Sequence, residues 1–463
     1  MSALLLIPEP PALIDLCPIA SSPPLEAVEP EQERSLVPPV PESIDDTGLA
    51  HSVIEQLAFK FLYFRGEMLG RDLATAMGFK FSLIENLIEG IKRQHLVQVK
   101  RSLGMGNSSA VIALSEAGRN LTREYLENNQ YTGPAPVPLF QYTWFARHQR
   151  REAGWLTQEA LKHAYRKMVV TEKLLAEIGP AVGSGNSFLI YGQPGNGKTF
   201  LAEALSGLDD SDIYIPHAIE SQGQIVQLFD PIYHQPVEDA AEQSAIFEPT
   251  HDGRWIKCRR PFITTGGELT MQMLDLSYNE TSKVYDAPYQ LKANNGIYLI
   301  DDFGRQRCTP AEVLNRWIVP MERRVDYLTF RAGGKMTVPF EAFLVFSTNL
   351  KPSQLGDEAF LRRIQYKMLL RSPDTDEFGS IFENFCKSRE LPFDRAVLDR
   401  FIEKHYRTTA KPFRRCHPRD VLSHVIDLIH FERRPFELTE ELLDQAFGAA
   451  LCRTKSRIRE LEN

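Results

Sequence analysis

The sequence predicts a mixed α/β fold, in which helices sandwich a parallel sheet, a helical region follows and a smaller helical domain with two strands precedes. Three observations predict this fold. Apolar runs of strand length, SFLIY, IYLI and FLVFST, lead into glycine or polar residues, as the strands of a buried parallel sheet do. Helical patterns separate these runs. Beyond residue 376 the patterns are helical only.

The length of 463 residues is too great for one compact core and predicts two or three domains. The longest apolar runs are far shorter than a membrane span. The start, MSALLLIPEPP, lacks a basic segment and meets proline at once, which is untypical of a signal peptide. We therefore expect a cytoplasmic protein. Six cysteines without a CxxC pair indicate neither a disulfide framework nor a zinc site.

Residues 1–48 differ from the rest in charge and proline content. They hold nine acids and one base, a charge of 1 − 9 = −8, which leaves 52 basic and 52 acidic residues elsewhere. They also carry ten of the thirty prolines. Such a segment cannot bury enough apolar surface to fold, so we expect a disordered acidic tail, acting as a spacer or as a partner-binding arm.

Residues 49–128 show three helical patterns, then the strand patterns LVQVK and AVIALS, then a closing helix. Three helices followed by a two-stranded wing resemble the winged-helix family. The third helix carries Glu85 and Glu89, which would weaken contacts with DNA phosphates, although Lys100 and Arg101 could touch a DNA backbone. We therefore favour protein docking over DNA binding for this domain.

A linker is expected at 129–150, since YTGPAPVP is rich in proline. The α/β domain is then expected at 151–375 and the helical region at 376–463.

The stretch GQPGNGKT matches the phosphate-binding pattern G-x-x-x-x-G-K-[ST] between a strand and a helix. Its backbone N–H groups would surround phosphate oxygens. Lys198 is expected to reach the β- and γ-phosphates, and the Thr199 hydroxyl to hold Mg²⁺. ATP and Mg²⁺ are therefore the expected ligands. The expected binding residues are Gly192, Gln193, Pro194, Gly195, Asn196, Gly197, Lys198, Thr199 and Phe200.

The strand IYLI ends in two carboxylates, Asp301 and Asp302. Taken alone, this pattern is typical of a solvated strand end. Beside a phosphate-binding loop, it predicts a metal site at Asp301 and a residue that orients or deprotonates the attacking water at Asp302.

The order of the motifs resembles the AAA+ superfamily of ring-forming ATPases over about residues 150–435. After the aspartates come a helix ending in MERR, a hairpin around RAGGK, and a strand ending in Thr-Asn. This order is similar to the branch with a hairpin before the sensor-1 strand, which includes MoxR-type chaperones and NtrC-type ATPases. The resemblance implies an AAA+ core, a helical lid and a homo-oligomeric ring, expected to be a hexamer.

The same resemblance implies further site residues. Asn349 would be sensor 1 and position the attacking water. Arg363, or secondly Arg362, would be the arginine finger that enters a neighbouring subunit, and a surface ion pair is the alternative for it. Arg419 would be sensor 2 and touch the nucleotide from the lid.

Two features depart from the family pattern. About a hundred residues separate Lys198 from Asp301, so we expect an insert at about 215–295 that contains a hairpin and the acidic stretch EDAAEQ. Trp255, Lys257, Arg259 and Arg260 in this insert could grip a polymer or merely decorate a sheet edge. The Asp-Asp pair replaces the usual Asp-Glu, which predicts slow or partner-stimulated hydrolysis.

These expectations describe a Mg²⁺-dependent ATPase motor that remodels a protein partner. Two alternatives remain open: a DNA-associated ATPase in transcription activation or replication, and a nucleotide-gated switch with little turnover.

Overall fold

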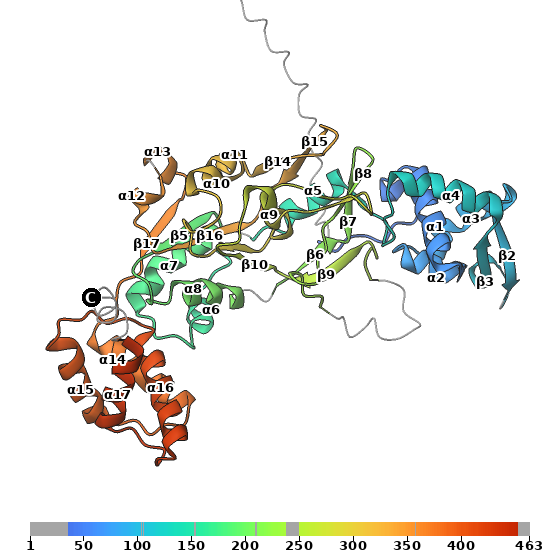
Figure 1. Ribbon diagram of the computed structural model, residues 1–463. Helices are drawn as coiled ribbons and strands as arrows, with labels where there is room; N and C mark the ends of the chain where they lie inside the picture. Colours follow the sequence, from blue (N-terminus) through green and yellow to red (C-terminus); the bar gives the residue numbers. More distant parts are fainter. Residues whose placement is uncertain are drawn as a thin grey trace, which may run out of the picture. The chain divides into compact units, whose positions relative to one another are not determined.

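The computed structural model describes residues 36–102, 104, 106–151, 154–208, 211–237, 250–356 and 358–451 (Figure 1). Most of the predicted tail, the stretch EDAAEQ and residues 452–463 lie outside these ranges. The predicted tail boundary is wrong for residues 36–48, which form ordered structure. Pro38 accepts a hydrogen bond from the Asp252 backbone, and Thr47 is fully buried. The proline content of this segment predicted a disordered tail, but contacts with residues far along the chain hold the segment in place.

The N-terminal domain contains four helices and a small antiparallel sheet. The helices are α1 (His51–Arg65), α2 (Gly70–Ala76), α3 (Phe81–Arg93) and α4 (Glu116–Asn128). The strands are β1 (Glu67–Leu69), β2 (Val97–Ser102) and β3 (Ala110–Leu114), in the order β1-β3-β2. The predicted helices and both predicted strands are present, and β1 is an additional strand that the sequence patterns did not reveal. Glu85 is exposed on α3, and Glu89 is half-buried.

The α/β domain is built on five parallel strands. They are β5 (Ser187–Tyr191), β10 (Phe262–Thr265), β13 (Ile297–Ile300), β16 (Phe343–Thr348) and β17 (Tyr366–Leu369). Their order is β10-β13-β16-β5-β17, and each neighbouring pair is parallel. The carboxyl ends of β5, β13 and β16 therefore meet at one edge of the sheet.

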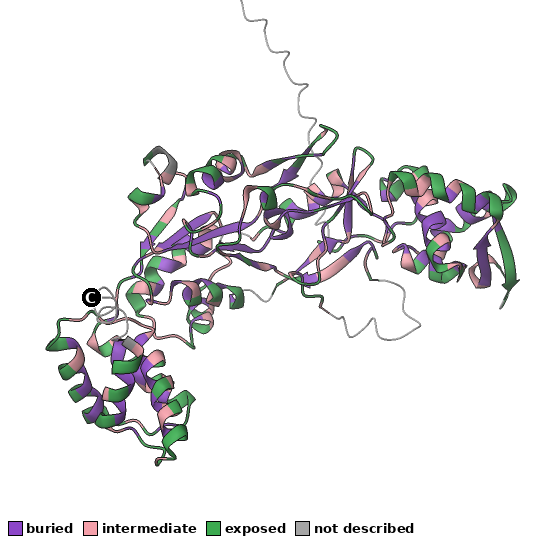
Figure 2. Ribbon diagram, viewed as in Figure 1, coloured by how far each residue is buried: buried purple, intermediate pink, exposed green. Residues whose placement is uncertain are grey.

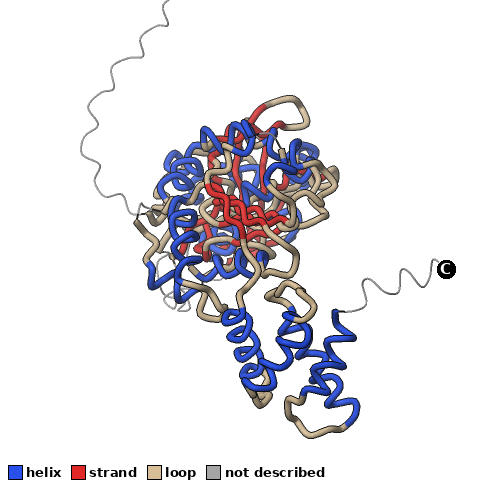
Figure 3. The backbone as a smooth tube through the Cα atoms, turned by 90° about the vertical axis from the view of Figure 1, so that its left-hand side faces the viewer, coloured by secondary structure: helices blue, strands red, loops and turns tan. Residues whose placement is uncertain are grey.

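Helices cover both faces of this sheet, as the predicted α/β fold requires (Figures 1 and 3). One apolar cluster joins the sheet to α10 (Pro310–Arg316) and α11 (Ile318–Arg323) through Val313, Leu314 and Trp317. The other joins it to α6 (Gln158–Ala164), α7 (Glu172–Ser184) and α8 (Lys198–Glu203). The three central strands, β13, β16 and β5, are buried almost throughout, whereas the edge strands β10 and β17 are partly exposed (Figure 2).

A second sheet gathers strands from distant parts of the chain. Its strands are β4 (Val137–Pro138), β7 (Ala218–Ser221), β8 (Gln224–Gln227), β11 (Ser277–Asn279) and β12 (Val284–Asp286), in the order β11-β12-β8-β7-β4. Two antiparallel strand pairs share its apolar core, β6 (Asp212–Pro216) with β9 (Trp255–Arg259) and the hairpin of β14 (Val325–Thr329) with β15 (Lys335–Pro339). The short helix α9 (Tyr289–Lys292) leads into β13.

The structure corrects two predicted boundaries here. Residues 129–150 are not a plain linker, because they supply β4 and the helix α5 (Leu139–His148), whose Tyr142 and Phe145 enter the core of the second sheet. The predicted insert also contains β10, which is a strand of the main sheet.

Two residues of the basic-aromatic cluster of the insert, Trp255 and Lys257, make contacts within the chain. Trp255 is 3% exposed and packs on Phe145 at 4.8 Å between ring centroids. Lys257 lies 3.6 Å from the carboxylate of Asp212. Trp255 is thus unable to stack on a polymer, which corrects that interpretation.

The C-terminal region is helical, as predicted. It contains α14 (Thr375–Ser388), α15 (Arg395–Ile402), α16 (His417–Glu432) and α17 (Glu440–Leu451), around its own apolar core. Two short helices, α12 (Pro352–Leu355) and α13 (Glu358–Leu361), precede it. None of the helices formed by the described residues combines the length and apolarity that a membrane span requires.

Candidate functional site

The loop between β5 and α8 contains the predicted phosphate-binding sequence. Gly195 and Gly197 have φ values of +80° and +83°, which L side chains rarely adopt. At Gly192 a Cβ atom would lie 2.4 Å from the Leu370 carbonyl oxygen, so only glycine lets this loop pass the end of β17. The glycines of the motif therefore have a steric reason in this chain.

Lys198 begins α8 and its residue is 6% exposed. Its Nζ donates hydrogen bonds to the carbonyl oxygens of Gly192 (3.1 Å) and Gln193 (3.2 Å) and to Oδ1 of Asn349 (2.6 Å). Burial lowers the pKa of Lys198, while the nearby Asp302 and Asp301 oppose this shift. The ammonium group thus lies in the loop that is expected to bind phosphate, held by neutral oxygens.

Thr199 and Asp301 lie together at the ends of α8 and β13. The Thr199 hydroxyl donates to the Asp301 carboxylate, with Oγ1 at 3.0 and 2.9 Å from its two oxygens. The Asp301 backbone is fixed as well, because its N–H donates to Thr265 and its carbonyl accepts from Nε2 of Gln306 (both 2.8 Å). A hydroxyl beside a carboxylate is an oxygen donor set of the kind Mg²⁺ prefers, so these residues fit that ion.

Asp302 follows in a left-handed conformation, with φ = +49°. Asp and Asn adopt this conformation more readily than other side chains. Oδ1 of Asp302 accepts a hydrogen bond from Nδ2 of Asn349 at 3.0 Å. Asn349 therefore links two groups, since its Oδ1 accepts from Lys198 and its Nδ2 donates to Asp302. The strand end is held by a further bond from Phe303 N–H to the Ser347 carbonyl (2.7 Å).

A cavity of about 590 Å³ opens beside these residues. Lys198, Thr199, Asp302 and Asn349 contribute its polar lining. Its apolar lining includes Met168, Val169, Phe200, Ile381 and Phe385. The cavity thus combines polar groups suited to phosphates with apolar side chains suited to a flat apolar group, as a nucleotide requires.

The helical region contributes two arginines to the lining of this cavity. Arg419, the predicted sensor 2, lines the cavity but donates to the neighbouring Asp420 at 3.0 and 3.1 Å. Arg415 also lines it and donates to the Val169 carbonyl (2.9 Å) and the Glu377 carboxylate (2.8 Å). The buried Nε of Arg415 has no hydrogen-bond partner in the part of the chain that the structure describes.

Sequence reasoning missed Arg415, Cys416 and Gln306. The backbone N–H of Cys416 donates to the carbonyl of Gly195 (2.9 Å), which ties the start of α16 to the phosphate-binding loop. The segment FRRCHPRD contained a signal for Arg415, because it holds three arginines next to a predicted helix start. Gln306 carried no signal, since its role depends on how the chain turns after Asp302.

Arg362 and Arg363 are not among the residues lining this cavity. Nε of Arg363 lies 2.8 Å from Oε1 of Glu322 at the end of α11. Arg362 is exposed after α13. The structure thus brings together the loop, both aspartates, Asn349 and Arg419 within one chain, but neither candidate finger.

Residues 374–449 match a family described as a domain of unknown function, DUF8689. A search of curated proteins finds no match to this sequence.

Several solved structures are similar to parts of the chain. NtrX from Brucella abortus is 12% identical, with a TM-score of 0.39 over 64% of this chain and 58% of that one. NtrX in complex with ADP is 13% identical, with a TM-score of 0.38 over 75% and 65%. The Thermotoga maritima RuvB Holliday junction branch migration motor is 15% identical, with a TM-score of 0.33 over 65% and 72%. This chain spans less than two thirds of either NtrX chain, and these likenesses are too low to assign it a family or an activity.

Proposed function

We propose that this protein binds ATP with Mg²⁺ and hydrolyses it. The observation that carries the proposal is the group Lys198, Thr199, Asp301, Asp302 and Asn349, which lies within hydrogen-bond contact beside one cavity. These are the residue types that phosphoryl transfer to water needs: a phosphate-binding lysine, oxygen ligands for a cation, and a carboxylate near the water.

Each residue has a role in this proposal. Backbone N–H groups of the loop bind phosphate oxygens, and Lys198 exchanges its carbonyl partners for the β- and γ-phosphates. Thr199 and Asp301 are the residues that would hold Mg²⁺. The bound ion would supply positive charge to the phosphate oxygens. Asp302 accepts the proton of the attacking water, and Asn349 orients Asp302 through their 3.0 Å hydrogen bond.

The helical region, proposed as a lid, is expected to respond to the nucleotide. Cys416 and Arg415 connect it to the loop at Gly195 and to the cavity wall at Val169. A nucleotide in the cavity would contact both the phosphate-binding loop and the helical region. Hydrolysis would therefore alter the lid contacts and transmit a movement, as the resemblance to AAA+ motors implies.

We further propose that residues 49–128 form a winged-helix domain and that the chain assembles into a ring, in which Arg363 or Arg362 serves a neighbouring subunit. A protein partner is favoured over DNA. Glu85 is exposed on α3, and Trp255 is buried and unavailable for stacking on bases. Anisotropy with labelled DNA over about 50 to 200 mM salt tests this choice, since a steep loss of affinity would indicate DNA.

The main test is phosphate release with ATP, with and without Mg²⁺, by the wild type and by Lys198→Ala. The matched control is Lys387→Ala, because Lys387 is an exposed lysine paired with Glu383 on α14. We expect Mg²⁺-dependent release that falls at least about 10²-fold in Lys198→Ala and is unchanged in Lys387→Ala. Turnover that is absent or independent of Lys198, with the protein alone and with a partner, would refute the proposal.

A further inference from the structure

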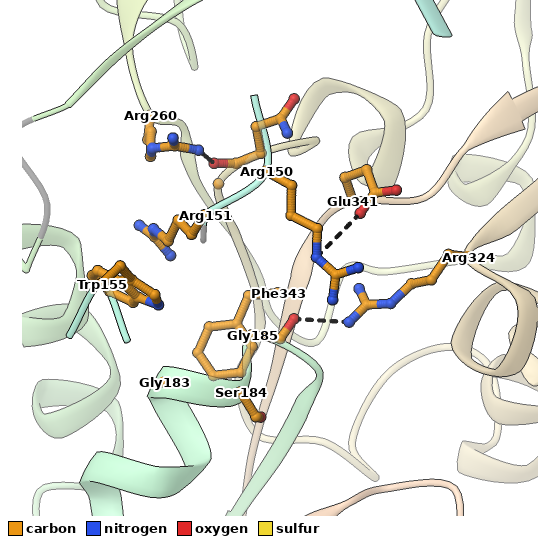
Figure 4. Close-up of a pocket in the computed structure, with 12 residues that line it drawn as sticks. Arg150, Arg151, Trp155, Gly183, Ser184, Gly185, Arg260, Arg324, Glu341 and Phe343 are labelled. Carbon is orange, nitrogen blue, oxygen red and sulfur yellow. Dashed lines mark hydrogen bonds and ion pairs between the residues drawn. The ribbon is translucent and has the colours of Figure 1, made fainter. Parts of the chain in front are cut away.

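A second pocket lies at the opposite end of the main sheet. It has a volume of about 330 Å³ and is lined at the amino ends of three core strands, where Gly185 precedes β5, Gly296 precedes β13 and Phe343 begins β16 (Figure 4). The strands are parallel, so this pocket is separate from the cavity at their carboxyl ends. Its size is near the lower limit of small-molecule sites.

Positive charge dominates the pocket. Among the described residues that line it, there are four arginines and one carboxylate, that of Glu341. The arginines come from three segments of the chain: Arg150 with Arg151, Arg260, and Arg324. Figure 4 shows the side chains of Arg150 and Arg324 side by side with Glu341. Burial and the neighbouring Arg150 both lower the pKa of Arg324, which indicates repulsion between the two guanidinium groups.

Arg324 donates hydrogen bonds to neutral oxygens of the chain. Arg324 donates to the Gly185 carbonyl at 3.1 Å and to Oδ1 of Asn186. Arg260 donates to the Asn295 carbonyl at 2.8 Å and to Oγ of Ser211 at 2.9 Å. The two bonds of Arg324 hold its guanidinium group in place without neutralising it. An anion in the pocket would supply the missing negative charge.

Glu341 indicates a second chemical property that a ligand of this pocket should have. Its side chain is 6% exposed, and Oε2 is buried without a hydrogen-bond partner among the described residues. Nε of Arg150 lies 3.9 Å from it, which is too far for a hydrogen bond. A buried carboxylate oxygen without a donor is costly. A ligand for this pocket should therefore carry a hydroxyl donor as well as an anion.

We propose that this pocket binds a small phosphate ester that also carries hydroxyl groups, such as a sugar phosphate. The phosphate would contact Arg150 and Arg324, and a hydroxyl would donate to Glu341. Trp155 offers an aromatic wall, over which the Arg151 guanidinium lies at 4.2 Å from the ring centroid. The volume favours a small molecule over a nucleic acid strand. This site is independent of the proposed ATPase site.

The test is calorimetric titration of the full-length protein with ribose 5-phosphate, inorganic phosphate and ribose. We expect ribose 5-phosphate to bind best and ribose not to bind. Arg150→Gln should weaken ribose 5-phosphate binding about tenfold or more, as expected for the loss of a charged hydrogen bond. Arg150 is 49% exposed, so this variant should fold. The control Arg395→Gln replaces an exposed arginine of α15 that pairs with Asp399 and should bind normally.

Two further variants test where ribose 5-phosphate binds and whether its hydroxyl groups are recognised. Lys198→Ala should leave ribose 5-phosphate binding unchanged, because the ligand does not occupy the ATP loop. Glu341→Met should reduce the preference for ribose 5-phosphate over inorganic phosphate, since it removes the acceptor for the hydroxyl but keeps the arginines.

Several outcomes would overturn the proposal. They are no binding of either phosphate, binding that Lys198→Ala abolishes, and binding that Arg150→Gln leaves intact. Tighter, Arg150-dependent binding of a short single-stranded oligonucleotide would also overturn it, since the source of phosphate would then be a nucleic acid.

Discussion

Two substitutions of Asp302 each change a single property of its side chain, either the charge or the length. Asp302→Asn removes the charge and keeps the length of the side chain. Asparagine also tolerates the left-handed backbone at φ = +49° and can still accept the hydrogen bond from Asn349. We expect ATP affinity and the free energy of unfolding to change by less than about 1 kcal/mol. Loss of the base should lower kcat about 10²- to 10⁴-fold.

Asp302→Glu keeps the charge and adds one methylene. In the structure Asn349 already reaches the aspartate at 3.0 Å, so the site has the dimensions of the shorter side chain. Glutamate moves the carboxylate by about 1 Å, a displacement that can cost about 10²-fold in rate. The left-handed backbone adds a cost of up to about 1–2 kcal/mol. We therefore expect kcat to fall in this variant also.

The assay is steady-state phosphate release at saturating ATP and Mg²⁺, together with ATP affinity measured by calorimetry. The idea that Asp302 is a weakened replacement for glutamate predicts the opposite sign, a higher kcat in Asp302→Glu. An unchanged kcat in Asp302→Asn would refute the role of Asp302 as the base.

Three other predictions concern the loop, a buried ion pair and pH. Gly192→Ala places a Cβ 2.4 Å from the Leu370 carbonyl oxygen, so thermal unfolding should show a lower Tm and calorimetry a weaker affinity for ATP. Arg254→Met leaves the Asp252 carboxylate buried and unpaired, and should cost about 3–5 kcal/mol in urea unfolding; a loss below about 1 kcal/mol would contradict this. Burial lowers the pKa of His417 to about 4 from an unfolded value of about 6.5, so the folded state resists protonation. Stability should therefore fall as pH drops from about 6.5 toward 4, by about 2 kcal/mol at pH 5. Hydrogen-exchange protection of α16 should show this loss in the wild type but not in His417→Gln.

The sequence predicted those parts of the fold and site that depend on short segments. The loop, both aspartates and Asn349 each follow an apolar strand directly, so their meeting follows once the strands are parallel. The second sheet was not predictable in this way. Its strand β4 is only two residues long and pairs with β7, about eighty residues later. Likewise, the prolines before residue 48 favoured disorder, although Arg254 donates a hydrogen bond to the Thr47 carbonyl at 2.9 Å.

The pairing of β4 with β7 has a practical consequence for dividing this chain into fragments. A fragment that starts at residue 151, where the α/β domain was expected to begin, would lack β4 and α5. The edge of β7 would then expose unpaired backbone groups, and the apolar surface that contacts Val137, Tyr142 and Phe145 would face water. Such a fragment should aggregate. Expression of the α/β domain therefore requires a start before residue 131, so that the segment regarded as a spacer remains attached to the sheet it completes.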